Sequence, residues 1–225
     1  MTNINQRIII SLLGLPGSGK GTQAEFLISE FNASHISIGE LVREEINSNT
    51  PNLKKFNIKE KYDQGIPQDD SLVKMLIQNK LINTENNIIF DNYPFSKKQA
   101  EDFFEIIKEL KVKNILAINI KISKKTSLDR ISSRLVCKKC GEIFINNGKL
   151  TNCSKCGTKL IQRSDDKPNI VNKRLMFYIP RILEVRNMFT ENARYLEING
   201  ENSINEVKIE LLNKVNQWKN SQKAI

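Results

Sequence analysis

Hydrophobic residues in this chain form short continuous runs that alternate with segments of helical periodicity. The apolar runs predict four buried strands: Ile8–Leu13, Asn87–Asp91, Asn114–Ile122 and Tyr195–Ile198. Apolar positions spaced three or four apart predict three helices: Thr22–Phe31, Gln99–Leu110 and Ser203–Trp218. Alternating strands and helices of this kind are typical of an α/β fold in which helices cover both faces of a parallel sheet.

Two segments interrupt this alternation. Residues 37–68 are polar and largely helical in pattern, whereas residues 133–166 contain all four cysteines and two glycine turns. Both are therefore expected to be insertions on a core made of residues 1–36, 69–132 and 167–225.

A glycine-rich loop follows the first predicted strand and leads into the first predicted helix. Its sequence is Gly14-Leu-Pro-Gly-Ser-Gly-Lys-Gly-Thr22. Glycines let the backbone curl so that successive N–H groups point inward, at the positive end of the helix. The order of strand, loop and helix predicts a phosphate cradle in which Lys20 reaches the outer phosphates. The usual Ser or Thr directly after the lysine is replaced by Gly21, and Thr22 comes one position later.

The cysteines form two CxxC pairs, Cys137 with Cys140 and Cys153 with Cys156, separated by twelve residues. This spacing predicts a four-thiolate zinc site, which is tetrahedral, structural and without an open coordination position. A glycine follows each pair, as the tight turns of zinc knuckles require.

The chain has 225 residues, a net charge of +10, 39% hydrophobic residues and 27% charged residues. A positive charge of this size is typical of proteins that bind nucleic acid or a membrane surface. Lysines are nevertheless spread among acidic residues, and cations are also what a polyphosphate cleft needs. Nucleic-acid binding by a zinc ribbon stays open as an alternative, because five lysines lie in that segment: Lys138, Lys139, Lys149, Lys155 and Lys159.

The amino terminus shows no pattern of a signal peptide. The run Ile8–Leu13 is too short to span a bilayer and continues directly into the glycine loop. Paired cysteines suit a metal site in a reducing compartment better than disulfides. A cytoplasmic protein without a membrane partner is therefore expected.

Five segments resemble the long-lid, zinc-containing bacterial adenylate kinases, over nearly the whole chain. The loop variant Gly-x-Pro-Gly-x-Gly-Lys-Gly-Thr-Gln is found in that family. The other similar segments are His35–Arg43, Phe90–Ala100, Arg163–Asp166 with Arg174-Leu175, and Tyr195–Gly200. The resemblance implies a P-loop nucleoside monophosphate kinase fold, with 37–68 as the AMP-binding insert and 133–166 as the zinc-binding lid.

The resemblance also implies a reaction, in which ATP with Mg²⁺ phosphorylates AMP to give two ADP. The implied catalytic residues are Lys20, Asp91, Arg134, Arg163 and Arg174. The implied ATP-binding residues are Gly17, Ser18, Gly19, Lys20, Gly21, Thr22, Arg130, Arg134, Ile143, Phe144 and Asn202. The implied AMP-binding residues are Ile38, Arg43, Ile66, Pro67, Gln68, Asn92, Tyr93, Pro94, Phe95, Gln99, Arg163 and Arg174.

Particular roles follow from these positions. Arg43 and Arg174 would hold the acceptor phosphate, and Arg134 and Arg163 would close on the transferring group. Arginine suits both tasks because its planar fork binds phosphate oxygens bidentately. In the same way, Arg130 would stack on the donor adenine, Asp91 would hold Mg²⁺ through water, and Gln99 would read the adenine of AMP. A monomer that does not bind nucleic acid is expected from the resemblance.

Two positions depart from the family pattern. Phe95 stands where an arginine is expected after Pro94, and Ile38 stands where a threonine precedes Gly39. The lost guanidinium would weaken AMP binding by about 2–3 kcal/mol, the value of a charged hydrogen bond. Lys97 or Lys98 is a candidate replacement.

These departures leave two alternatives open. One is a nucleoside monophosphate kinase with a changed acceptor base, and the other is a nucleotide-binding relative with weakened catalysis. The second is disfavoured because Lys20, Asp91 and the lid arginines are all retained.

Overall fold

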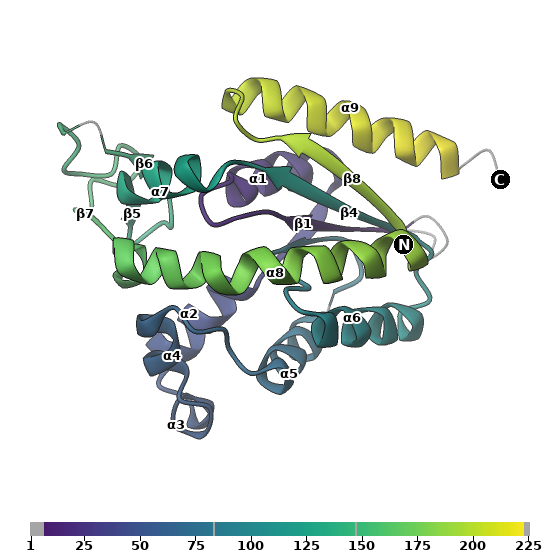
Figure 1. Cartoon of the computed structure of the whole chain (residues 1–225), viewed down its shortest axis with the longest axis horizontal. Coiled ribbons are helices and arrows are strands. Elements are labelled where there is room, and N and C mark those ends of the chain that lie inside the picture. Colours follow the sequence, from purple (N-terminus) through teal and green to yellow (C-terminus); the bar gives the residue numbers. More distant parts are fainter. Residues whose placement is uncertain (1–6, 83, 147, 223–225) are drawn as a thin grey trace.

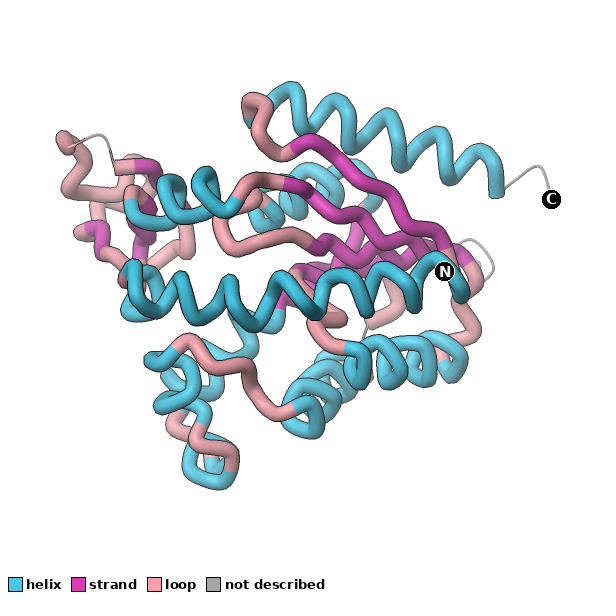
Figure 2. Tube along the Cα trace, in the orientation of Figure 1, coloured by secondary structure: helices cyan, strands magenta, loops and turns pink. Residues whose placement is uncertain are grey.

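A computed structural model describes residues 7–82, 84–146 and 148–222. Its centre is a five-stranded, fully parallel sheet (Figures 1 and 2). The strands lie in the order β2-β3-β1-β4-β8. The strands are β1 Ile8–Leu13, β2 Ala33–Ser37, β3 Asn87–Asp91, β4 Asn114–Lys121 and β8 Arg194–Asn199. The expected central parallel sheet is confirmed, and each of the four predicted strands is present.

The strand β1 lies between β3 and β4 and is buried along its whole length. Its alternate side chains enter two different apolar clusters, Ile8, Ile10 and Leu12 on one face and Ile9 and Leu13 on the other. A strand covered on both faces needs a continuous apolar sequence, which is why it could be recognised.

Helices cover both faces of the sheet (Figure 1). On one face, α1 Lys20–Phe31 packs beside α9 Ile204–Gln222. On the other face lie α5 Asp70–Leu81, α6 Lys97–Glu109 and part of α8 Pro168–Asn192. A further helix, α7 Lys124–Ser132, packs against the first half of α8.

The segment 37–68 folds into three helices, as its pattern predicts. They are α2 Ile38–Ser48, α3 Pro51–Lys55 and α4 Ile58–Gln64. They lie below the sheet in Figure 1, beside α5 and α8.

A second, small antiparallel sheet lies beside the C-terminal end of α7 and the N-terminal end of α8 (Figure 2). Its strands, in the order β6-β5-β7, are β6 Ile143–Ile145, β5 Arg134–Cys137 and β7 Leu160–Ile161. A small cluster of buried side chains, Cys137, Cys153 and Leu160, forms its core. A short 3-10 helix, Ser164–Asp166, connects β7 to α8. Within the described ranges, no helix is long and apolar enough to cross a membrane.

Candidate functional site

One cavity of about 660 Å³ lies where the parallel strands end. Ser37 at the end of β2, Asp91 at the end of β3 and Gly200 after β8 all line it. Ligands of open parallel sheets bind at this edge, and the volume suits a nucleotide-sized ligand. The cavity wall includes most of the predicted site residues: Gly17, Ser18, Gly19, Lys20, Gly21, Thr22, Ile38, Arg43, Ile66, Pro67, Gln68, Asp91, Asn92, Phe95, Gln99, Arg130, Arg134, Ile143, Arg163, Arg174 and Asn202.

The glycine loop is held in a shape that other residues would oppose. Gly14 has φ +145°, and a Cβ there would lie 2.5 Å from the carbonyl oxygen of Ile120. Gly19, the N-cap of α1, has φ +92° in the left-handed region. The loop therefore delivers the free N–H groups of the first turn of α1 into the cavity, where an anion can accept them.

Lys20 lies inside this loop, where its Nζ donates to the carbonyl oxygens of Gly14 at 2.7 Å and Leu15 at 3.1 Å. The pKa of Lys20 is lowered to about 8, mainly by desolvation; the negative charge of Asp91 opposes this shift, and the positive charges of Arg174 and Arg134 contribute to it. A bound polyphosphate would supply the negative charge that stabilises the protonated amine.

The arginines of the cavity come from separate elements and carry more charge than their acidic partners balance. Arg134 on β5 donates to both carboxylate oxygens of Asp166, and Arg174 on α8 donates to Asp165 Oδ2 at 2.7 Å. Burial lowers the pKa of Arg163 to about 10, and the like charges of Arg43 and Arg134 add to that effect. A cluster of cations that repel one another is a site prepared for a multiply charged anion.

The helical insert is hydrogen-bonded to the connection that leads from the small sheet into α8. The hydroxyl of Tyr62 on α4 donates to Asp165 Oδ1 at 2.9 Å, and the hydroxyl of Ser164 donates to Asp63 Oδ1 at 3.0 Å. Asp165 thus contacts both Tyr62 and Arg174. These contacts connect the helical insert to the ion pairs around the arginines.

Asp91 ends β3 beside the start of α1, and its Oδ1 is buried with no hydrogen-bond partner within the described residues. Its Oδ2 lies 3.8 Å from the position that a Cβ on Gly21 would occupy. A buried carboxylate oxygen next to a phosphate cradle fits a hard, hydrated cation such as Mg²⁺.

At the other end of the cavity, Gln99 is already engaged within the protein. Its Oε1 accepts the backbone N–H of Phe95 at 2.8 Å, and its Nε2 donates to Asp70 Oδ1 at 2.8 Å. The amide is buried and its orientation is fixed by these two partners. One amide hydrogen and one carbonyl lone pair remain for a ligand.

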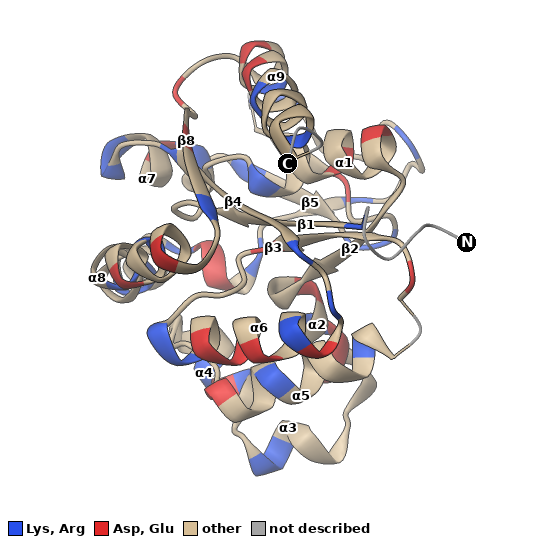
Figure 3. Ribbon diagram, turned by 90° about the vertical axis from the view of Figure 1, so that its right-hand side faces the viewer, with Lys and Arg blue, Asp and Glu red and all other residues tan. Residues whose placement is uncertain are grey.

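Phe95 packs against side chains of α8. The centroid of its ring lies 5.1 Å from that of Tyr178 and 5.2 Å from the guanidinium of Arg181. Lys98, one candidate for replacing the missing guanidinium, instead pairs with Asp102 at 3.1 Å. Figure 3 shows opposite charges interspersed on α6, where this pair lies. Neither Lys97 nor Lys98 lines the cavity.

Three predicted site residues lie away from the cavity wall. Tyr93 is fully buried between Phe90 and Phe103, with ring centroids 5.3 Å and 5.9 Å away. Pro94, which follows it, is also buried. Phe144 packs against the small core of the second sheet. Tyr93 and Phe144 thus pack against apolar neighbours, while the adjacent residues Asn92, Phe95 and Ile143 line the cavity.

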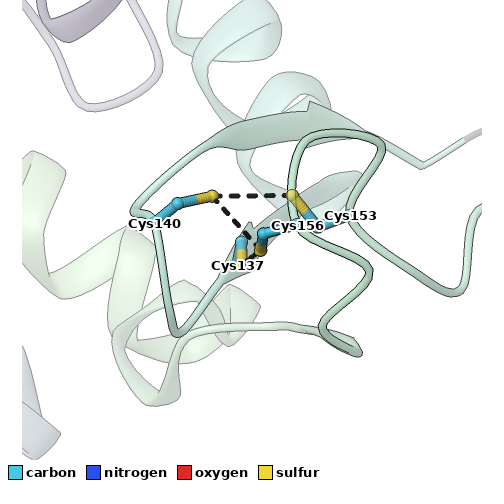
Figure 4. A group of neighbouring side chains, drawn as sticks. All are labelled: Cys137, Cys140, Cys153 and Cys156. Atoms are coloured by element: carbon cyan, nitrogen blue, oxygen red, sulfur yellow. Dashed lines mark hydrogen bonds between the residues drawn. The ribbon is translucent and has the colours of Figure 1, made fainter.

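The four cysteine sulfurs converge at one end of the second sheet (Figure 4). The separations are 3.4 Å for Cys137–Cys156, 3.5 Å for Cys140–Cys153 and 3.7 Å for Cys140–Cys156. Four sulfurs around tetrahedral zinc lie about 3.8 Å apart, given a Zn–S bond of about 2.3 Å. Hydrogen bonding with Thr158 lowers the pKa of Cys156 to about 6. The backbone of Glu142 lowers the pKa of Cys140, but burial and the neighbouring cysteines outweigh it and raise that pKa to about 12. The group fits one zinc ion.

Some cavity residues were not predicted, among them Gln23, Tyr62, Asp165, Tyr178 and Ile204. Two of them adjoin recognised positions in a way that sequence spacing could have revealed. Gln23 directly follows Thr22, and Tyr178 lies one helical turn after Arg174. Asp165 lies within the family-like segment Arg163–Asp166, whereas Tyr62 and Ile204 reach the cavity through tertiary packing, which leaves no local signal.

Comparisons with known proteins point to one family. A family model described as adenylate kinase matches residues 12–194. An adenylate kinase of Pyrococcus horikoshii is 37% identical over 203 residues, covering 88% of this chain and 91% of its own length. Adenylate kinases of Elusimicrobium minutum and Caldanaerobacter subterraneus are 36% and 35% identical, over 219 and 204 residues, covering 94% and 88% of this chain and 100% and 91% of their own lengths.

Proposed function

The chain belongs to the adenylate kinase family, and on that premise we propose that it transfers the terminal phosphoryl group of ATP to AMP, reversibly and with Mg²⁺, giving two ADP. The observation that carries the proposal is the convergence of cationic side chains on one cavity at the end of the sheet, namely Lys20, Arg43, Arg134, Arg163 and Arg174. Phosphoryl transfer needs positioning and charge neutralisation more than covalent chemistry, and this cluster supplies both.

On the donor side, the backbone amides of Gly17 to Thr22 would receive the phosphates of ATP. Lys20 would leave the carbonyls of Gly14 and Leu15 and bind the outer phosphates. Arg130, Ile143 and Asn202 line the same cavity and would surround the base and ribose.

On the acceptor side, Arg43 and Arg174 would hold the phosphate of AMP, and Gln99 would read its adenine. An oxygen of that phosphate attacks the terminal phosphorus of ATP as the bond to the bridging oxygen breaks, so ADP leaves as the other product. Arg134 and Arg163 would neutralise the charge that spreads over the transferring oxygens. No side-chain base is required, since the attacking phosphate oxygen is already anionic.

Two metals fit the residues present. Asp91 would hold Mg²⁺ through its water shell, and the metal would supply neutralisation of the phosphate charge. The four cysteines would hold a structural zinc ion that stabilises the small sheet, whose own apolar core is minimal.

The same proposal divides the chain by role. Residues 37–68 act as the AMP-binding insert, residues 133–166 act as the lid, and the rest forms the core. Closure of the lid would bring Arg134 and Arg163 over the transferring phosphate and exclude water. A cytoplasmic monomer remains the expected form of the protein.

The decisive test is ADP formation with ATP and Mg²⁺ in the presence of AMP, CMP, UMP or GMP. Turnover with AMP and little with the others is expected. Absence of turnover with every acceptor, in protein that still binds ATP, would refute the enzymatic proposal.

A second candidate is a nucleoside monophosphate kinase with another preferred acceptor base. It is favoured by Ile38, which lines the cavity at the first position of α2, and by Phe95, which places an aromatic ring where a cation is expected. A preference for CMP, UMP or GMP in the acceptor panel would replace the first proposal with this one.

A further inference from the structure

Gln23 is a buried cavity residue that the reaction described above does not use. It lies in the first turn of α1, directly after the phosphate loop, and it is 2% exposed. It lines the cavity together with Ile204 and Val207 of α9. A polar side chain buried this deeply needs a partner for each of its hydrogen-bonding groups.

The orientation of the Gln23 amide is fixed by its contact with α9. The Nε2 donates to the backbone carbonyl oxygen of Ile204 at 3.1 Å. A carbonyl can only accept, so the nitrogen and not the oxygen must face Ile204. The Oε1 is therefore directed elsewhere, and it is buried without a hydrogen-bond partner among the described residues.

The surroundings of this oxygen define what would bind it. The Gln23 amide holds the first residue of α9, just after the loop Gly200–Ser203, and that loop lines the cavity at Gly200, Asn202 and Ser203. Ile204 and Val207 add apolar surface beside it. Apolar surface with one fixed acceptor is suited to the flat face and edge of a base that carries an N–H donor.

We propose that Gln23 Oε1 accepts a hydrogen bond from the exocyclic amine of the donor adenine, so that Gln23 is a specificity-determining residue for ATP. This inference rests on the proposed donor site. A base with an oxygen at the same position would direct a second acceptor at Oε1 and leave both unsatisfied. Discrimination arises because the anchored amide cannot rotate to present its nitrogen without losing Ile204.

The experiment measures equilibrium binding of ATP, ITP and purine riboside triphosphate by calorimetry, in wild-type protein and in Gln23→Met. Purine riboside triphosphate lacks only the amine, so it isolates that group. We expect wild-type protein to bind ATP about tenfold more tightly than either analogue, and Gln23→Met to reduce this ratio to about one. An unchanged ratio in Gln23→Met would overturn the proposal.

A second variant separates recognition from anchoring of the loop. Gln23→Glu keeps an acceptor oxygen but loses the N–H that donates to the carbonyl oxygen of Ile204. We expect this variant to retain a preference for ATP. Loss of the preference in Gln23→Glu as well would show that the anchor alone matters, which refutes direct recognition. Gln217→Met, an exposed glutamine on α9, is the matched control and should leave the ratio at its wild-type value.

A further set of ligands tests the ribose as the partner of Oε1. If Gln23→Met instead abolishes discrimination between ATP and its 2′-deoxy or 3′-deoxy forms, the partner is a ribose hydroxyl and the proposal fails. Because binding is measured without AMP, selective ATP binding with no ADP formation would refute the proposed reaction and leave the assignment of Gln23 intact.

Discussion

The proposed donor and acceptor ends of the cavity are built in different ways. The donor end is made largely of backbone, with glycines at Gly14 and Gly19 holding the loop and the first turn of α1 presenting its N–H groups. The acceptor end is made of side chains from separate elements, with Arg43 on α2, Phe95 before α6 and Arg174 on α8. A binding site made of backbone groups depends on the conformation of one continuous segment. A binding site made of side chains can change its binding groups one residue at a time.

The two departures from the family pattern both fall at the acceptor end. Phe95 packs against Tyr178 and Arg181, and Ile38 packs against the apolar core. Both replacement side chains thus make packing contacts of their own, in addition to removing a polar group. We therefore expect the protein to have an ordinary donor site and an altered acceptor site.

The largest effect is expected at the donor end, for Lys20→Met. The loss of the loop cation should reduce kcat/KM for ATP by about a thousandfold or more, because charge stabilisation at the transferring phosphate is lost. Steady-state kinetics with saturating AMP measures this. Lys20→Arg, which keeps the charge but not the shape, is the matched control. Near-normal activity of Lys20→Met would show that the loop is not the donor site.

The same variant should be more stable than wild-type protein without ligand. The folded-state pKa of Lys20, about 8, lies below the usual 10.5. Below pH 8 the folded protein therefore keeps a charge that burial disfavours, and stability rises as the pH increases from 8 towards 10.5. Lys20→Met should raise the free energy of unfolding at pH 7 by about 1–2 kcal/mol. The gain should shrink above pH 8, as chemical denaturation across this range would show.

The next largest effect is expected from the removal of zinc. The small sheet has few buried apolar residues, so chelation, or Cys140→Ser with Cys153→Ser, should unfold it while the central sheet stays folded. Turnover should fall by about tenfold to a hundredfold because Arg134 and Arg163 lose their support. Metal analysis should give one zinc per chain before treatment. Full activity in metal-free protein would contradict this role.

The sequence predicted the core of the fold well because its central strands are buried on both faces. The run Ile8–Leu13 and the run Asn87–Asp91 appear as strands with the expected bounds. The strand Ala33–Ser37 was missed because it lies at the sheet edge and carries polar Ser34 and His35. The helix Pro168–Asn192 was missed because it is only partly covered, with exposed Met176, Ile179 and Leu183 that blur its pattern, and contains a proline.

Site residues could be predicted from the sequence where the residues that act together have a characteristic spacing within one segment. The loop residues and the cysteines converge as expected because each set lies within one short segment. The partners of Gln99, Phe95 and Arg174 could not be predicted, since Asp70, Arg181 and Asp165 meet them only through the packing of α5, α6 and α8.

A smaller effect is expected from Phe95→Arg, which restores a cation at the acceptor end. The KM for AMP should fall by about tenfold, less than the full value of about 2–3 kcal/mol for the lost guanidinium because Arg181 opposes the new charge, and the KM for ATP should not change. The guanidinium of Arg181, 5.2 Å from the ring that is replaced, would repel the new charge. The double variant Phe95→Arg with Arg181→Met should therefore bind AMP more tightly than Phe95→Arg alone. An unchanged KM for AMP in both would remove Phe95 from the acceptor site.

The smallest effect is expected from Ile38→Thr, because a neutral hydroxyl contributes less than a charge. The new hydroxyl lies on the cavity wall at the start of α2 and should lower the KM for AMP by about twofold to fivefold, while sharpening the preference over CMP and UMP. Ile38 also packs against the core, so its loss should cost about 1 kcal/mol of stability. Ile38→Val, which shortens the side chain without adding a hydroxyl, separates the two effects. If Val and Thr change the KM equally, packing and not recognition explains the result, and the acceptor end differs from the family at Phe95 alone.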